Sequence, residues 1–274
     1  MSGTLSCALT IAGSDSGGGA GIQADLKAFA MHGVYGLSVL TVLTAQNTVG
    51  VQGLSVPDPG FVTRQLNSVL DDFPVKAAKT GMLFSAEIIS EVASAMNKNS
   101  IPLVVDPVCV SQSGHPLLQD SAVEAMKSQI IPRAFLLTPN KPEAELLTGI
   151  SNLNTGEKIL EAMKIFRKMG ASSVLVKGGH FESSGVMTDW LAIEDNDPFP
   201  VTRSRINTRN THGTGCTLSA AITANLAKGL GLEDAVLRAR DYLQQTIKYS
   251  FDLGRGDGPV NHLAGLTQVG ILNW

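Results

Sequence analysis

Short apolar runs alternate with longer amphipathic stretches along most of the chain. The runs are rich in Val, Ile and Leu without regular polar interruptions, which is typical of strands buried on both faces. Six such runs are Cys7–Ala12, Leu37–Ala45, Val75–Ala78, Leu103–Val105, Phe135–Leu137 and Val174–Val176. Helical stretches cover approximately 20–32, 59–71, 85–98, 118–129, 142–148 and 155–169. This order predicts an α/β fold of three layers, with a mostly parallel central sheet and helices on both faces.

The segment 186–206 departs from this alternation. Its two strand-like pieces, Val186–Ile193 and Val201–Ile206, are joined by a polar linker containing Glu-Asp-Asn-Asp-Pro, which predicts an antiparallel hairpin at the edge of the sheet. Two long helices are expected near 215–229 and 233–253. Because no low-complexity linker, repeat or charge block interrupts the chain, we expect residues 1–274 to form a single domain.

Composition narrows the range of functions. Of the 274 residues 43% are hydrophobic, and the formal net charge of −3 provides no basic field for nucleic acid. The N-terminus lacks a signal-peptide pattern, and no apolar stretch approaches the roughly 18 residues of a membrane span. The cysteines Cys7, Cys109 and Cys216 are too few and too widely spaced for a disulfide framework or a CxxC metal site. We therefore expect a cytoplasmic protein that binds neither membranes nor nucleic acid.

Polar and glycine residues follow the predicted strands one after another. Ligands of open parallel sheets bind beyond the carboxyl ends of the strands, so this pattern indicates one site along one edge of the sheet. The segments are Gly13–Asp15, Gln46–Thr48, Lys79–Gly81, Asp106–Pro107, Thr138–Asn140 and Lys177–His180.

Single members of this set allow simpler interpretations. Asn140 could be a helix N-cap ahead of Pro142, and Asp106 could open a turn. Lys79 and Lys177 are harder to explain, because a lysine at the end of a buried strand needs an anionic partner. Phosphate is one candidate for that partner.

Two glycine-rich segments lie where a ligand could approach the backbone. The first, Gly13–Gly21, lacks the Gly-Lys-Ser/Thr of a Walker loop and the G-x-G-x-x-G spacing of a nicotinamide-binding fold. Its glycines allow close approach to a flat ligand, although a flexible strand–helix connection is the simpler alternative. The second, Asn210–Ala221, opens a helix, and its exposed amides would form an anion site for a transferring phosphoryl group.

Cys216 lies within this second segment. A thiol at a helix N-terminus is expected to have a lowered pKa, so Cys216 is a candidate base for the hydroxyl of a phosphoryl acceptor. The alternative is a buried, inert cysteine, which we expect for Cys7 and Cys109.

At these segments the chain resembles the hydroxymethylpyrimidine/phosphomethylpyrimidine kinases of thiamine synthesis, within the ribokinase-like superfamily. The resemblance covers about residues 7–263. It rests on Gly13–Asp25, Ala45–Thr48, Lys79–Met82, Asp106–Val108, Thr138–Glu143, Val176–His180, Asn207–Cys216 and Gly256–Val260.

The resemblance implies two successive phosphoryl transfers from Mg-ATP, first to 4-amino-5-hydroxymethyl-2-methylpyrimidine and then to its monophosphate. It implies substrate contacts by Gly13, Asp15, Ala20, Gln46, Met82 and Val108. It implies nucleotide contacts by Lys177, Asn140 and Thr211, and magnesium ligands in Asp106 and Glu143. Gly213 and Gly215 would supply the anion hole beside a catalytic Cys216, and a homodimer is the family expectation.

Two rival functions and one loop stay open at this point. A pyridoxal/pyridoxine kinase shares the chemistry, although Gln46 with Met82 favours a pyrimidine; a non-catalytic pyrimidine-binding protein is the rival of another class. The polar loop 109–120 is either a lid that closes over substrate or an ordinary surface loop. Residues 266–274 match nothing that we can interpret.

Overall fold

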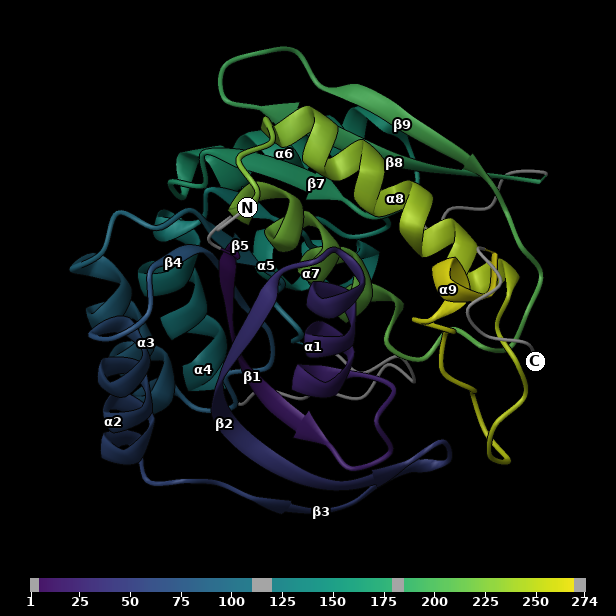
Figure 1. Ribbon diagram of the computed structural model, residues 1–274. Helices are drawn as coiled ribbons and strands as arrows, with labels where there is room; N and C mark the ends of the chain where they lie inside the picture. The colour runs from purple at the N-terminus through teal and green to yellow at the C-terminus, as the bar shows by residue number, and fades with distance from the viewer. Residues whose placement is uncertain (1–4, 110–119, 179–184, 269–274) are drawn as a thin grey trace.

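The computed structural model describes residues 5–109, 120–178 and 185–268, in which a central sheet lies between two layers of helices (Figure 1). The strands are β1 (Cys7–Asp15), β2 (Tyr35–Asn47), β3 (Gly50–Ser55), β4 (Val75–Thr80), β5 (Leu103–Val105), β6 (Leu136–Leu137), β7 (Ser173–Val176), β8 (Val186–Ile193) and β9 (Phe199–Ser204). Their order in the sheet is β3-β2-β1-β4-β5-β6-β7-β8-β9. The six strands from β2 to β7 in that order are parallel, which confirms the fold class that the sequence predicts.

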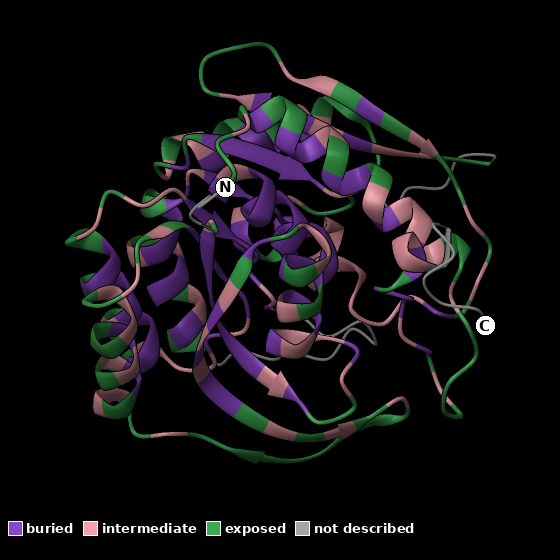
Figure 2. Ribbon diagram, in the orientation of Figure 1, coloured by how far each residue is buried: buried purple, intermediate pink, exposed green. Residues whose placement is uncertain are grey.

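The antiparallel strands lie at the two edges. β8 and β9 form the expected hairpin beside β7. β3, antiparallel to β2 at the opposite edge, was not expected. All six of its residues are exposed, so it carries no apolar pattern from which a strand could be predicted (Figure 2).

The helices are α1 (Gly21–Met31), α2 (Pro59–Leu70), α3 (Ala86–Asn97), α4 (Asp120–Ala125), α5 (Lys141–Thr148), α6 (Gly156–Lys168), α7 (Thr214–Ala227), α8 (Leu232–Lys248) and α9 (Ala264–Gln268). Two differ clearly from expectation. α4 gives way to a π-helical turn at Met126–Ile130 and a 3-10 turn at Ile131–Arg133, and α8 ends five residues before the predicted position 253.

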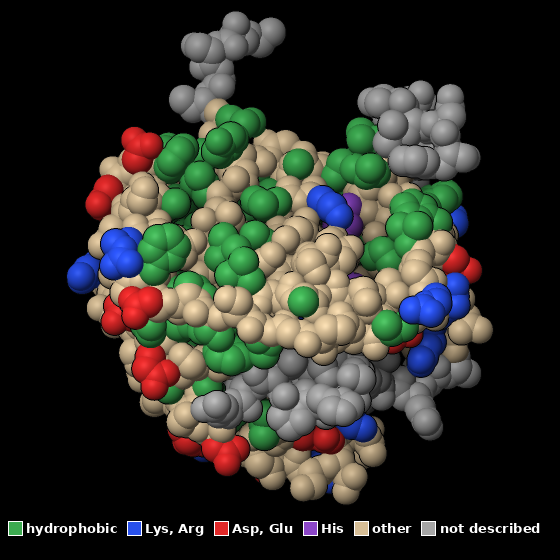
Figure 3. All heavy atoms as spheres, turned by 90° about the horizontal axis from the view of Figure 1, so that it is seen from below, with side chains coloured by type: hydrophobic (Ala, Val, Ile, Leu, Met, Phe, Trp, Pro, Cys, Tyr) green, Lys and Arg blue, Asp and Glu red, His purple; other side chains and the backbone are tan. Residues whose placement is uncertain are grey.

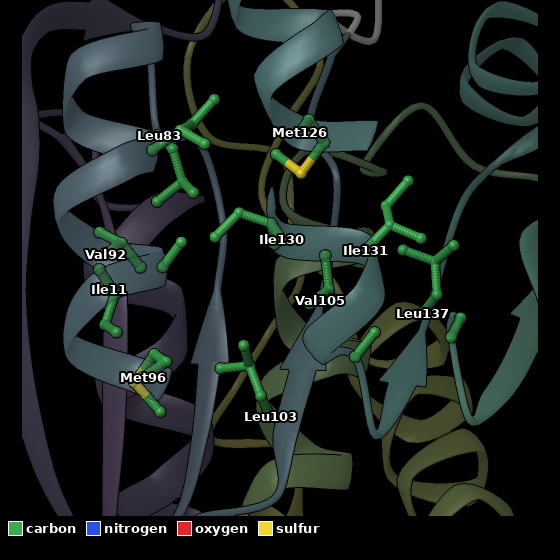
Figure 4. Packing of buried hydrophobic residues seen from close by; sticks show 14 of the residues in the cluster. Ile11, Leu83, Val92, Met96, Leu103, Val105, Met126, Ile130, Ile131 and Leu137 are labelled. Atoms are coloured by element: carbon green, nitrogen blue, oxygen red, sulfur yellow. The ribbon is translucent and has the colours of Figure 1, made fainter. Parts of the chain in front are cut away.

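Both faces of the sheet are apolar, which explains why its strands lack polar alternation. In β5, Leu103 and Val105 pack into the cluster beneath α2–α6, whereas Val104 packs against α7 and α8. β7 repeats the pattern with Val174 and Leu175 on opposite faces. Figure 4 shows the largest of the hydrophobic clusters, in which Val105 lies near Ile130 and Leu137 lies beside Ile131. None of the described helices is long and apolar enough to cross a membrane.

A fully buried ion pair links α1 to the sheet. Lys79 Nζ of β4 lies 2.7 Å from Asp25 Oδ1 of α1, and neither side chain is exposed. Thr10 Oγ1 of β1 donates to the other carboxylate oxygen at 2.6 Å. The anionic partner of Lys79 is therefore a side chain, and the phosphate candidate was wrong for this lysine. The pair holds the helix that follows the first glycine-rich segment in a fixed place on the sheet.

Removing one member of this pair leaves a buried charge without a partner. We expect Lys79→Met to lower the free energy of unfolding by about 3–5 kcal/mol, and Lys79→Met/Asp25→Asn to recover most of that loss because no net charge is then buried. Urea unfolding followed by circular dichroism checks this. An equal loss in the single and the double variant would contradict it.

Candidate active site

Asp15 organises the loop between β1 and α1. Its Oδ1 accepts the N–H of Gly17 at 2.8 Å, and its Oδ2 accepts those of Gly19 and Ala20 at 3.0 and 2.8 Å. Gly18 adopts a positive φ of 77° in this turn, which favours glycine. The carboxylate, expected to contact substrate, is buried and accepts hydrogen bonds from the loop, so it fixes the backbone of the β1–α1 loop.

His212 joins this loop to the second glycine-rich segment. Its Nε2 lies 2.8 Å from Asp15 Oδ2. Burial raises the pKa of Asp15, but the hydrogen bond from His212 and those from the Ala20 and Gly17 amides outweigh it and hold that pKa below its ordinary value. The sequence analysis included His212 in the motif Asn207–Cys216 but gave it no role. Nothing in the sequence connects it to Asp15, which lies 197 positions earlier.

Gly213 brings the start of α7 into contact with the same loop. It is the N-cap residue of α7 with a φ of 81°, a left-handed conformation. A Cβ at this position would overlap the carbonyl oxygen of Gly19 and lie 3.3 Å from Ala20 Cα. The two glycine-rich segments therefore touch through backbone atoms, and only glycine fits at position 213.

Three of the residues expected to bind substrate, Gly13, Gln46 and Met82, lie near or just beyond the ends of the neighbouring strands β1, β2 and β4. A Cβ on Gly13 would lie 2.8 Å from Val42 Cγ1 and 3.9 Å from Met82 Cβ, so Gly13 and Met82 are neighbours. The Gln46 main chain exchanges two hydrogen bonds with Ser16 Oγ, at 2.7 and 2.8 Å, and its Oε1 accepts from Thr44 Oγ1 at 3.1 Å.

Val108 follows Asp106 and Pro107 at the end of β5. It has a φ of 44°, which is uncommon for a β-branched residue and fixes the chain direction there. Its side chain is half-buried. The proposed lid begins directly after it: Cys109 is buried, whereas 110–119 lie outside the described residues.

A charged cluster lies on the other side of the α7 N-terminus. Lys177 Nζ is 2.8 Å from Asp106 Oδ1 and 3.9 Å from Glu143 Oε2. A Cβ on Gly215 would lie 3.4 Å from Lys177 Nζ and 3.6 Å from Asp106 Oδ2. Ser219 Oγ, which the sequence analysis missed, donates to Asp106 Oδ2 at 3.3 Å. Ser219 lies one helical turn after Gly215, which is the signal that could have found it.

Asn140 and Glu143 form a capping box at the start of α5. Asn140 Oδ1 accepts the Glu143 N–H at 2.9 Å, and Glu143 Oε2 accepts the Asn140 N–H at 2.8 Å. The interpretation of Asn140 as an N-cap is thus confirmed, and the cap directs Glu143 toward Lys177. Burial raises the pKa of Glu143 to about 7, against the opposing effect of Lys177.

The expectation of a lowered pKa for Cys216 was wrong. Removal from water by the surrounding protein raises the pKa of Cys216 to about 12, although the nearby Lys79 acts in the opposite direction. Proximity to a helix N-terminus does not overcome this loss of hydration. Cys216 lies half-buried in the first turn of α7, where it presents a neutral thiol.

Thr211 precedes Gly213 and Gly215 and supports the turn into α7. Its carbonyl oxygen accepts the N–H of Thr214 at 3.2 Å, and its own N–H donates to the carbonyl of Arg209 at 3.0 Å. The residue is half-buried. These contacts define its backbone position near the first turn of the helix.

The relatives of this chain are named as kinases. A family model described as phosphomethylpyrimidine kinase matches residues 15–261. A hydroxymethylpyrimidine/phosphomethylpyrimidine kinase of Haemophilus influenzae is 47% identical over 259 residues, which are 93% of this chain and 96% of that protein. The thiamine biosynthesis bifunctional protein ThiED of Geobacter sulfurreducens is 47% identical over 95% of this chain and 53% of its own length.

Solved structures of two kinds of vitamin kinase share the fold. The pyridoxal kinase of Bacillus subtilis, in an ADP complex, superposes with a TM-score of 0.88 at 36% identity, covering 96% of this chain and 100% of that one. A phosphomethylpyrimidine kinase of Clostridium difficile superposes with a TM-score of 0.79 at 40% identity, covering 88% of this chain and 99% of that one. The extent of the family match and the identity to full-length relatives lead to one conclusion: the chain belongs to the phosphomethylpyrimidine kinase family.

Proposed function

We propose that this protein transfers the γ-phosphoryl group of Mg-ATP to the hydroxymethyl group of 4-amino-5-hydroxymethyl-2-methylpyrimidine, and then a second one to the resulting monophosphate, toward thiamine. One observation carries the proposal. The N-terminus of α7 lies between the loop that Asp15 organises and the cluster of Lys177, Asp106 and Glu143. An anion-binding helix end between an acceptor loop and a cationic side chain is the arrangement that phosphoryl transfer needs.

On the acceptor side, the proposal assigns the flat pyrimidine to the surface formed by Gly13, Ala20, Gln46, Met82 and Val108. The Gln46 amide carries both donors and an acceptor, which suits an aminopyrimidine edge. Cys216 would contact the acceptor as a neutral thiol, so alignment of the hydroxyl, rather than a thiolate base, would be its contribution. Positioning accounts for most of the acceleration in this class of reaction.

On the nucleotide side, Lys177 is the charged residue best placed to meet a phosphate. Its side chain is 14% exposed, whereas Asp106 and Glu143 beside it are nearly inaccessible. The first-turn amides of α7 at Gly213 and Gly215 would stabilise charge on the moving phosphoryl group. Asn140 and Thr211 would line the nucleotide side.

The residues present fit a magnesium ion. Asp106 and Glu143 share one ammonium group, so one carboxylate charge is left over when both are ionised. Two carboxylates are what such a site needs from the protein, since Mg²⁺ is usually bound by one or two carboxylates plus phosphate oxygens and water. When bound, the ion would neutralise phosphate charge.

Phosphorylation of pyridoxal is the second candidate, since the pyridoxal kinase of Bacillus subtilis covers 96% of this chain with a TM-score of 0.88.

We place the reaction in the cytoplasm, where ATP is available and the three free thiols of Cys7, Cys109 and Cys216 stay reduced.

A parallel assay of three acceptors tests the proposed substrate. ADP release is measured with hydroxymethylpyrimidine, its monophosphate and pyridoxine, each with Mg²⁺ and with excess chelator. We expect Mg²⁺-dependent turnover of both pyrimidines with kcat/KM at least about tenfold above that for pyridoxine, a difference of about 1.4 kcal/mol in transition-state binding. A preference for pyridoxine would reverse the order of the two candidates, and ADP release without any acceptor would indicate hydrolysis only.

Two glycines at opposite ends of α7 test the anion hole. Gly213 and Gly229 both have positive φ, 81° and 85°, but a Cβ on Gly229 meets nothing within 4 Å. We expect Gly213→Ala to lower kcat about 100-fold, because the helix start must move off the loop. Gly229→Ala is expected to lose about 1–2 kcal/mol of stability and keep its kcat.

Steady-state kinetics and thermal unfolding of both variants separate the two effects. If Gly213→Ala retained wild-type kcat, the α7 N-terminus would have no role in the transfer. If both variants lost the same fraction of kcat, backbone strain rather than position would explain the loss.

We also propose that a second copy of the chain covers the β3 edge. Val51 and Leu54 of β3 are 47% and 51% exposed, and Leu43, Val49 and Phe61 are exposed nearby. Figure 3 shows hydrophobic side chains gathered on this face. Residues 43–57 contain no charged side chain, so this edge lacks the charges that keep an edge strand from pairing. A homodimer is the arrangement that this surface supports.

Sedimentation velocity tests the homodimer. We expect the wild type to sediment as a dimer and Val51→Lys/Leu54→Lys as a monomer, because two charges would have to be buried at the edge. Leu146→Lys, at a position 44% exposed on α5, is the matched control and should stay dimeric. A monomeric wild type, or a dimer that persists in the double lysine variant, would contradict the proposal.

A further inference from the structure

Just after the end of β7, a side-chain carboxylate of β8 takes the place of a backbone carbonyl as hydrogen-bond acceptor. The β7–β8 ladder runs from Ser173 opposite Ile193 to Val176 opposite Trp190, and this register would bring Gly178 opposite Thr188. Instead, the Gly178 N–H donates to Asp189 Oδ1 at 2.7 Å. A Cβ on Gly178 would overlap the Thr188 carbonyl oxygen. The chain is therefore pressed against β8 and held there by one carboxylate, one residue after Lys177.

The carboxylate of Asp189 is itself held from α8. Arg240 Nε lies 2.6 Å from Asp189 Oδ2, with 5% and 0% of the two side chains exposed. Within the described part of the chain, Asp189 Oδ2, Arg240 Nε and Arg240 Nη2 have no partner with hydrogen-bond geometry, so the contact between the two side chains is an ion pair. A buried ion pair contributes little net stability, because the desolvation of both charges offsets their attraction. What this pair supplies is geometric: a carboxylate fixed in place and directed at the Gly178 N–H.

Lys177 is thereby anchored on both sides. Its own N–H donates to the Pro139 carbonyl at 2.9 Å, and the next N–H in the chain, that of Gly178, is bound by Asp189. Between these two anchors the side chain extends to place Nζ 2.8 Å from Asp106 Oδ1. Few backbone movements remain that would displace the ammonium group.

We propose that Asp189, supported by Arg240, is a positioning residue for phosphoryl transfer: it fixes the Lys177–Gly178 backbone so that the Lys177 ammonium meets the nucleotide phosphates. Asp189 itself contacts no substrate. The inference rests on the nucleotide-facing role proposed for Lys177. Displacement of a charged group by about 1 Å is enough to cost a large factor in rate.

Two double variants separate the hydrogen bond from the ion pair. Asp189→Asn/Arg240→Met and Asp189→Leu/Arg240→Met both remove the buried charges, but only Asn retains an oxygen for the Gly178 N–H. For the Leu variant we expect kcat/KM for ATP to fall about tenfold or more, with the KM for the pyrimidine changed less than about twofold. The Asn variant should stay within about threefold of the wild type. Equal kinetics in the two double variants would overturn the proposal, whatever their melting temperatures.

Arg240→Met alone provides a second measurement should the Leu variant fail to fold. Asp189 then keeps its oxygen but loses its support, and we expect an intermediate fall in kcat/KM for ATP with an unchanged pyrimidine KM. Wild-type kinetics in this variant would overturn the role of Arg240. If the KM for the pyrimidine rose by the same factor as the KM for ATP, the variant would have lost structure generally, which would also overturn the proposal.

Lys177→Met distinguishes failure of this inference from failure of the role proposed for Lys177. In a Lys177→Met background, Asp189→Leu/Arg240→Met should change ATP affinity, measured by titration calorimetry, by less than about twofold, because the group being positioned is gone. An additive loss would overturn the inference alone. If Lys177→Met by itself left ATP affinity and kcat unchanged, the role of Lys177 would fail, and the inference with it.

Discussion

The contact between the start of α7 and the β1–α1 loop is the constraint on which the rest of the site depends. Gly213 lies so close to the Gly19 carbonyl that no side chain fits between them, and Asp15 with His212 joins the same two segments through side chains. This contact determines where the positive end of the helix dipole points. The β1–α1 loop lies on one side of that point, and the Lys177 cluster lies on the other.

Buried charge is the second theme of the structure. Lys79 pairs with Asp25, Lys177 with Asp106 and Glu143, and Arg240 with Asp189. Apolar residues of similar volume would often serve stability equally well. Of the three cations, the Lys177 side chain is the most exposed, at 14%. The other two pairs fix elements that border the site. Lys79 and Asp25 hold α1 on the sheet, and Arg240 and Asp189 hold the backbone next to Lys177.

The similarity to pyridoxal kinases has a physical explanation in this arrangement. The nucleotide side that we propose consists of the helix end and the charged cluster, whose interaction with phosphate would not depend on the acceptor. The acceptor side that we propose includes Gln46 and Met82, which lie on β2 and two residues after the end of β4. On this proposal a different acceptor would be accommodated on the acceptor side, while the part of the fold that faces phosphate stays the same.

Much of this protein followed from the sequence alone. Continuous apolar runs predicted the parallel strands, because a strand covered by helices on both faces has no solvent-facing side and so no alternating polar residues. The ends of those strands pointed to Asp106 and Lys177, since parallel strands bring their carboxyl ends to one edge, whereas Glu143 followed only from the family resemblance. β3 escaped prediction because all of its residues are exposed.

Only the tertiary structure decided which charges pair and which groups ionise. Lys79 and Lys177 follow similar strands, yet Asp25 of α1 occupies the partner position of the first. Cys216 lies at a helix N-terminus, yet desolvation raises the pKa of its thiol to about 12. Asp189 and Arg240 gave no sequence signal, because their pairing joins a strand to a helix 51 positions later. Periodicity along a chain determines which faces are buried, whereas Coulomb energy and hydration depend on distances in space that only the folded chain sets.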